Sequence, residues 1–280
     1  MAWRLRVRHL TGFRYADDVL SSYNEARMTP LTDASQTALD TRVRITPRAT
    51  VSRYRDYWGS AVTAFDVHVP HTELTIEAHS VVETHPVPQV LAAVGWDVLR
   101  DMRVRETHVE YLTPTPYTAV DIEVCTAARE VAGDLPPRAA AREVADWLSS
   151  QVSYVSGATG VHTKAMEVWT QRKGVCQDLA HLTVGVLRSL GIPARYVSGY
   201  LHPDPAAEIG STVTGESHAW VQWWDGDWTS GDPTNGKPVG PEHVVVARGR
   251  DYWDVPPHKG VYSGPVGTAL GVVVEVTRLA

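Results

Sequence analysis

The sequence has 280 residues but only two cysteines, Cys125 and Cys176. Two thiols are too few to form a disulfide framework in a chain of this length. Cys125 lies in a run with helical periodicity, residues 120–131, where a small buried thiol is the usual state. A structural bridge between the two cysteines is the less favoured alternative. Cys176 is therefore the thiol whose position needs an explanation.

Long hydrophobic runs are also absent. Nowhere do about 18 apolar residues follow one another, as a membrane-spanning helix requires. The first six residues, MAWRLR, lack the apolar centre of a signal peptide. We therefore expect no membrane association and a cytoplasmic location.

The chain lacks an excess of positive charge. Its formal net charge is −6 and its isoelectric point is about 6.0. Because binding to a phosphate backbone needs a concentrated basic surface, we expect no nucleic-acid partner. Arg4, Arg6 and Arg8 are a local exception. They alternate with apolar residues, so the exposed face of a strand explains them better than an anion site does.

Common metal-binding spacings are missing too. The chain has 12 histidines, but no H-E-x-x-H and no paired C-x-x-C. The pair His68 and His71 is weak by itself. We expect no metal and no cofactor, and a metal-dependent hydrolase is the least favoured of three functional alternatives.

Hydrophobic residues make up 43% of the chain, which is enough to bury a substantial core. In the first part of the chain, apolar and polar residues alternate as in strands, at Trp3/Leu5/Val7, Val43/Ile45, Phe65/Val67/Val69 and Leu74/Ile76/Ala78. This pattern predicts an N-terminal antiparallel β domain over residues 1–85. Pro86 and Pro88 favour an extended linker at residues 85–88, and a second domain is expected over residues 86–280.

The second domain changes from helical to strand patterns along its length. Helices are predicted over residues 119–132, 137–152 and 163–171, and then from Cys176 onward. Strands are predicted over residues 194–200, 218–224, 228–230 and 271–276, with a hairpin turn at Asp225 and Gly226. This order predicts an α+β fold in which the cysteine helix packs on an antiparallel sheet.

Cys176 is predicted to lie in the first turn of its helix. Apolar residues at helical spacing follow it, and Gly191 and Pro193 end the pattern. Unpaired N–H groups and a partial positive charge at a helix start favour a thiolate. A buried inert thiol explains Cys176 about equally well when this residue is considered alone.

A cysteine nucleophile needs a base within reach and a group that orients the base. His218 begins one predicted strand and Asp232 follows the next, so the hairpin between them can bring the two side chains together. Each has a structural alternative, since a lone histidine in an aromatic strand is usually structural and an aspartate before proline is often a turn residue. Together, in this order, Cys176, His218 and Asp232 predict a catalytic triad.

Other polar and aromatic residues nearby are given structural roles. Asp178 and His181 are interpreted as residues of the helix end rather than as direct catalysts. The loop at residues 203–215 either covers the site or is ordinary surface. Packing in the core is favoured over a substrate wall for Trp220, Trp223, Trp224 and Trp228.

Four segments resemble the bacterial transglutaminase-like family of the papain-like cysteine-enzyme superfamily. They are GVCQDLAHL (174–182), GIPARYVSGYL (191–201), SHAWV (217–221) and DPTN (232–235). The strand-rich N-terminal part resembles the β region that precedes this core in family members, and residues 249–257 resemble its closing segment. The resemblance therefore extends over nearly the whole chain.

The resemblance implies an N-terminal antiparallel β module followed by a papain-like or transglutaminase-like core. It implies that Cys176 is the nucleophile, His218 the general base and acid, and Asp232 the orienting carboxylate. The expected reaction is acyl transfer from an amide, either a glutamine side chain or a peptide-like bond, through a thioester. The expected substrate is a protein, a peptide or a small amide, and either water or a primary amine accepts the acyl group.

Two further points stay open at this stage. The backbone N–H of Cys176 is the natural first donor to the oxyanion, while Gln177 and Trp169 are candidates for the second. The alternative function is a non-catalytic peptide-binding or interaction protein on the same fold. An intact triad argues against that alternative.

Overall fold

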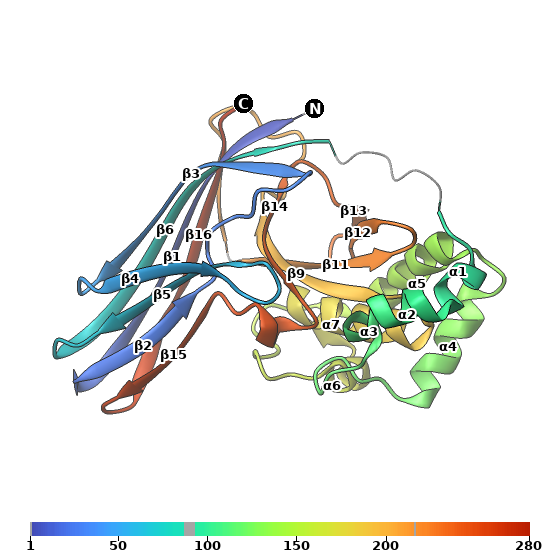
Figure 1. Ribbon diagram of the computed structural model, residues 1–280, viewed down its shortest axis with the longest axis horizontal. Helices are drawn as coiled ribbons and strands as arrows, with labels where there is room; N and C mark the ends of the chain where they lie inside the picture. Colours follow the sequence, from blue (N-terminus) through green and yellow to red (C-terminus); the bar gives the residue numbers. More distant parts are fainter. Residues whose placement is uncertain (1, 87–92, 216) are drawn as a thin grey trace.

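The computed structural model describes residues 2–86, 93–215 and 217–280. Figure 1 shows a region built of strands beside a part in which helices pack along one side of a further sheet. We call these the β region and the core. The mixture of helices with antiparallel sheets confirms the predicted α+β class.

The β region contains two antiparallel sheets. Sheet A has five strands in the order β10 (Thr212–Gly215), β16 (Gly267–Arg278), β1 (Trp3–Val19), β6 (His71–Thr84) and β3 (Gln36–Thr46). Sheet B has four, in the order β15 (His258–Ser263), β2 (Ser21–Ala26), β5 (Ala61–Val67) and β4 (Thr50–Arg55). The four alternating patterns of the sequence thus lie in or next to β1, β3, β5 and β6, as predicted.

The β region takes strands from both ends of the chain. β16 pairs with β1 and β15 pairs with β2, so residues 258–278 lie beside the N-terminal strands. The division into domains 1–85 and 86–280 stays a prediction, and this pairing was not part of it. Residues 87 and 88 of the predicted linker lie outside the described residues.

Strand β1 contributes to two hydrophobic clusters. Near its start, Leu5 and Val7 are buried in the same cluster as residues of the core. Farther along, Tyr15 packs with Phe65 between the two sheets of the β region. The opposite face of β1 carries arginines in ion pairs, for example Arg8 with Glu77 at 2.7 Å. The arginines are therefore on the exposed face, as expected.

The core sheet has the order β13 (Lys237–Pro238), β12 (Trp228–Asp232), β11 (His218–Trp224), β9 (Ala194–Leu201) and β14 (His243–Gly249). Helix α7 (Cys176–Ser189) packs on β11 and β9, and every residue from Asp178 to Arg188 is buried. Helices α4 (Ile122–Ala132), α5 (Pro137–Gln151) and α6 (Ala165–Gln171) contact α7, and so does the short α3 (Val109–Leu112). The predicted packing of the cysteine helix on an antiparallel sheet is confirmed.

Several short elements complete the core. They are α1 (Trp96–Arg100), α2 (Met102–Thr107), α3 (Val109–Leu112), a 3₁₀ turn η1 (Tyr252–Asp254), and the parallel pair β7 (Ser153–Tyr154) and β8 (Lys173–Gly174). The sequence patterns did not predict α1, α2, α3 or β14. The pair β7 and β8 leads directly into α7.

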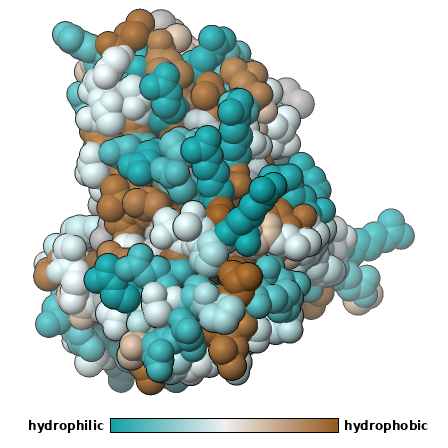
Figure 2. Space-filling model, turned by 90° about the vertical axis from the view of Figure 1, so that its left-hand side faces the viewer, coloured by the Kyte–Doolittle hydropathy of each residue, from teal (hydrophilic) through white to brown (hydrophobic). Residues whose placement is uncertain are grey.

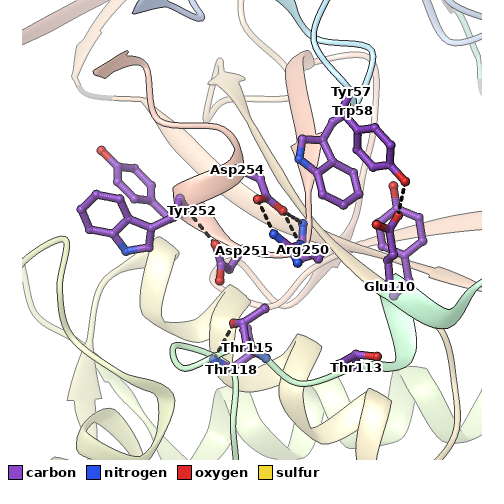
Figure 3. Close-up of polar contacts among 12 residues, drawn as sticks. Tyr57, Trp58, Glu110, Thr113, Thr115, Thr118, Arg250, Asp251, Tyr252 and Asp254 are labelled. Carbon is purple, nitrogen blue, oxygen red and sulfur yellow. Dashed lines mark hydrogen bonds and ion pairs between the residues drawn. The ribbon is translucent and has the colours of Figure 1, made fainter. Parts of the chain in front are cut away.

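The turn between β4 and β5 joins the β region to the core (Figure 3). The Tyr57 hydroxyl donates to Glu110 at 3.0 Å. The Arg250 guanidinium lies 5.1 Å from the Trp58 ring centre and forms an ion pair with Asp254 at 2.9 Å. These contacts connect β4 and β5 with α3 and with the segment after β14. Together with the shared hydrophobic cluster, they fix the β region against the core.

The far end of the β region exposes some hydrophobic residues, including Val261, Val266 and Leu270. Figure 2 shows this side of the molecule, where hydrophobic side chains alternate with hydrophilic ones. Apolar residues spread in this way are normal on a protein surface. Within the described residues, no helix combines the length and the apolar character needed to cross a membrane.

Candidate active site

Helix α7 begins at Cys176, as the sequence predicted. The preceding residue, Val175, is extended, with φ −114° and ψ −176°, and its N–H donates to the Asp178 carboxylate at 2.8 Å. A side chain at Gly174 would lie 2.9 Å from the Cβ of Asp178, so glycine is needed for the tight approach. The turn thereby places a partly exposed Cys176 at the positive end of a buried helix.

The hairpin of β11 and β12 brings His218 and Asp232 together. The two strands pair in antiparallel register. His218 Nε2 lies 2.8 Å from Asp232 Oδ2, and the Asp232 side chain is fully buried. Since Nε2 is engaged with the carboxylate, Nδ1 is the ring nitrogen available to Cys176.

The charges at this pair follow from its contacts. Burial is the largest single effect on His218 and would lower its pKa. The hydrogen bonds and negative charges of Asp232 and Cys176 together outweigh burial and raise the pKa of His218 to about 9. Burial would raise the pKa of Asp232, but its hydrogen bonds with His218 and His243 hold that pKa far below the usual range. At neutral pH the arrangement favours an imidazolium beside a carboxylate.

Two residues that were not predicted also hold Asp232. Asn235 Nδ2 donates to Asp232 Oδ2 at 2.7 Å, and His243 Nε2 lies 3.2 Å from the same oxygen. The backbone N–H of Gly240 donates to His243 Nδ1 at 3.2 Å. Because Nδ1 accepts, a neutral His243 carries its proton on Nε2 and donates it to Asp232.

Only a partial signal for these two residues is present in the sequence. Asn235 lies in the DPTN segment, but no role was assigned to it. His243 begins β14, which pairs with β9, and β9 in turn pairs with β11. Strands β9 and β11 therefore separate β14 from β12 in the sheet, and the buried His243 contacts Asp232 from the first position of β14 rather than from a neighbouring strand.

Among the residues that the structure describes, His218, Asp232 and His243 form a group that could hold a metal ion, because their ligand atoms lie within 4.8 Å of one another. The separations of 2.8 and 3.2 Å between Asp232 Oδ2 and the two Nε2 atoms are hydrogen-bond distances. Tetrahedral zinc with ligands at about 2.1 Å would hold them about 3.4 Å apart. The observed spacing therefore fits direct hydrogen bonds better than shared coordination.

Cys176 and His218 face a common cavity of about 280 Å³. Its walls come from both parts of the molecule: Tyr154, Val175, Leu201 and Pro203, with Val213, Thr214, Gly215 and Ser217, and with Val274 and Val276. Part of the loop at residues 203–215 thus borders the site. The four tryptophans that were predicted to pack in the hydrophobic interior, Trp220, Trp223, Trp224 and Trp228, do not line this cavity.

Neither candidate for the second oxyanion donor lines the cavity. The Gln177 amide donates to the Val161 carbonyl at 3.4 Å. Trp169 packs against Trp147, and the Arg172 guanidinium lies 3.5 Å from its ring centre. Both side chains are therefore engaged with other partners and not with the cavity.

His181 has a structural position on α7. Its side chain is fully buried, and its Nε2 accepts the Tyr252 N–H at 3.0 Å. Burial, with a smaller effect of the Arg188 charge, lowers the pKa of His181 to about 3, so the ring is neutral. His181 therefore anchors η1 to α7. Trp220 is fully buried too, and its ring stacks on that of His218.

The two cysteines are not joined. Cys125 is buried on α4, whereas Cys176 is partly exposed at the cavity, and both are free thiols. The less favoured alternative of a structural bridge is therefore wrong. The two environments also make Cys125 an internal reference for the reactivity of Cys176.

Two family models match the sequence. The model for the transglutaminase-like superfamily matches residues 126–233, a range that contains Cys176, His218 and Asp232. The model for the bacterial transglutaminase-like N-terminal region matches residues 5–83. Together they extend over both the β region and the core.

Individual relatives agree with these matches. An uncharacterized protein of Mycobacterium leprae is 48% identical over 99% of this chain and 100% of its own length. A protein-glutamine gamma-glutamyltransferase of Pseudomonas aeruginosa is 37% identical over 91 residues, which are 32% of this chain and 13% of that protein. A solved structure from Cytophaga hutchinsonii, described as a candidate cysteine protease, has a TM-score of 0.79 at 22% identity, over 100% of this chain and 92% of that one. This last likeness concerns the fold.

Proposed function

The chain belongs to the transglutaminase-like superfamily, and from this premise we propose that it is a cysteine-dependent acyl-transfer enzyme acting on amides. The acyl donor is a glutamine side chain or a peptide-like bond. The observation that carries the proposal is that Cys176 and His218 line a common cavity, with Asp232 hydrogen-bonded to His218 behind it. The named Pseudomonas aeruginosa relative supports an amide donor.

In the proposed reaction, His218 Nδ1 takes the proton of the Cys176 thiol, and Asp232 stabilises the imidazolium that results. The thiolate attacks the amide carbonyl, which forms the Sγ–C bond. The oxyanion lies near the start of α7, where the Cys176 backbone N–H can donate to it. Collapse breaks the C–N bond, and the leaving amine takes the proton from His218.

The thioester then reacts with water or with a primary amine. His218 removes a proton from either acceptor, and the thiol is regenerated as the new acyl product leaves. Water makes the enzyme an amidase or protease, and an amine makes it a transferase. We further propose a protein, peptide or small-amide substrate, a cytoplasmic location, and a catalytic domain over residues 86–280.

The proposal is tested with glutamine-containing peptides, incubated with and without a primary amine such as putrescine, and the products are weighed by mass spectrometry. Deamidated or cleaved peptide indicates hydrolysis, and peptide that carries the amine indicates transfer. If no acyl product forms and the peptides only bind, the non-catalytic interaction protein is the better account.

His243 is proposed as a positioning residue that orients Asp232. His243→Phe keeps an aromatic ring but removes the Nε2–H donor, and we expect kcat to fall about tenfold with little change in KM. His243→Gln supplies a new N–H donor and should recover part of the loss. The measurement is steady-state kinetics, with circular dichroism as the check on folding. An equal loss in both variants, or a rise in KM alone, would overturn this role.

A further inference from the structure

The cavity beside Cys176 has a wall that the β region supplies. Val213 and Gly215 lie on β10, and Val274 and Val276 lie on β16. The register pairs Val213 with Val276 and Gly215 with Val274. Directly paired residues project on the same side of a sheet. One face of sheet A therefore presents these positions to the nucleophile.

Apart from Thr214, this wall is apolar, and it has room at one point. Val274 and Val276 are each 2% exposed, and they belong to the hydrophobic cluster that also contains residues of the core. A Cβ added at Gly215 would meet nothing within 4 Å. The cavity therefore stays open where a larger residue on β10 would begin to fill it.

The opposite wall comes from the core and is also largely apolar. It includes Val175, Leu201 and Pro203. Among the described residues that line the cavity, only Cys176 and His218 can carry a full charge at neutral pH, and both charges are used in the reaction. A carboxylate or an ammonium group in this cavity would lose water without gaining an opposite charge.

From these walls we infer that the acyl donor presents an uncharged aliphatic group to sheet A, and that β10 and β16 determine this preference. The inference rests on the proposed function, because it names the acyl group that Cys176 accepts. A volume of about 280 Å³ lies just below the ~300–1,000 Å³ of typical small-molecule sites. One amino-acid side chain or a short acyl group fits such a space.

The test uses chloromethyl ketones, which alkylate a reactive thiol: the Sγ–C bond forms, the C–Cl bond breaks and chloride leaves. The probes are the chloromethyl ketones of N-acetyl-leucine and N-acetyl-glutamate, with chloroacetamide as a small reference. Rates at Cys176 are measured by mass spectrometry and divided by the chloroacetamide rate of the same variant. We expect the leucine probe to react about tenfold faster than the glutamate probe, or more.

Two substitutions in the wall test the assignment to sheet A. Val213→Lys should shift the preference toward the glutamate probe by about tenfold or more. Thr212→Lys is the matched control, because Thr212 precedes Val213 on β10 but does not line the cavity, and it should leave the ratio unchanged. Gly215→Val should slow the leucine probe relative to chloroacetamide by filling the open space.

The outcomes separate this inference from the proposed function. Equal relative rates for the two probes, or equal shifts in Val213→Lys and Thr212→Lys, would overturn the aliphatic site. The proposed function would be unaffected as long as chloroacetamide still alkylated Cys176. If chloroacetamide alkylated Cys176 and Cys125 at the same rate, the result would contradict the proposed function itself.

Discussion

Replacing Cys176 with serine is expected to lower amide turnover by at least about 10³-fold. The substitution keeps a side chain of similar size at the first turn of α7. A hydroxyl, however, gives up its proton much less readily than a thiol, so serine cannot form with His218 the ion pair that a thiolate and an imidazolium form. The measurement is product formation from a glutamine-containing peptide, followed by mass spectrometry.

The matched control for this change is Cys125→Ser. Cys125 is buried on α4 and has no place in the proposed reaction. We expect this variant to keep turnover near that of the unchanged chain. Substantial turnover by Cys176→Ser would show that another group is the nucleophile.

The second large effect is expected from Asp232→Asn, which should lower kcat by about 10² to 10⁴-fold. The neutral amide no longer stabilises the imidazolium of His218. Because burial still acts on the ring and lowers its pKa, the pKa of His218 should fall from the value of about 9. The protonated form of His218 then disappears at lower pH than in the unchanged chain.

This shift is measured by NMR titration of the His218 ring in both proteins. Asp227→Asn is the control, since Asp227 is an exposed residue of the same hairpin whose carboxylate accepts only the Trp228 N–H at 2.7 Å among the bonds described. That variant should titrate like the unchanged chain. If the His218 titration stayed in place in Asp232→Asn, the carboxylate would not be what raises its pKa.

The placement of Cys176 at a helix start and of His218 beside Asp232 could be predicted because both depend on local sequence. The apolar spacing after Cys176 specifies α7, and the glycine at position 174 allows the tight turn before it. His218 and Asp232 flank one hairpin, so the register of β11 and β12 alone brings them together. Such short-range pairings can be read from turn residues and alternation.

The remaining parts of the site do not follow from one hairpin. His243 is only 11 residues from Asp232 in the sequence, but it begins β14, which β9 and β11 separate from β12 in the sheet, so hairpin pairing does not predict this contact. The apolar wall of the cavity exists because β16, at the end of the chain, pairs with both β1 and β10. Alternation of apolar residues predicts that a segment is a strand but does not identify its partner.

The helices α1, α2 and α3 were missed for a different reason. Each spans six residues or fewer, and Leu99 is the one buried residue among them. A helix this short cannot repeat an apolar face, so periodicity gives no signal. Their positions are set by contacts with the core, such as the tilted contact of the His108 ring with the Trp224 ring.

The central claim, that Cys176 is a nucleophile activated by His218, is tested most directly by alkylation with chloroacetamide at pH 7, with each cysteine followed by peptide mapping. We predict that Cys176 reacts at least about tenfold faster than Cys125, and that His218→Ala removes most of this difference while the Cys125 rate stays the same. Equal rates at the two cysteines, or an unchanged Cys176 rate in His218→Ala, would contradict the account.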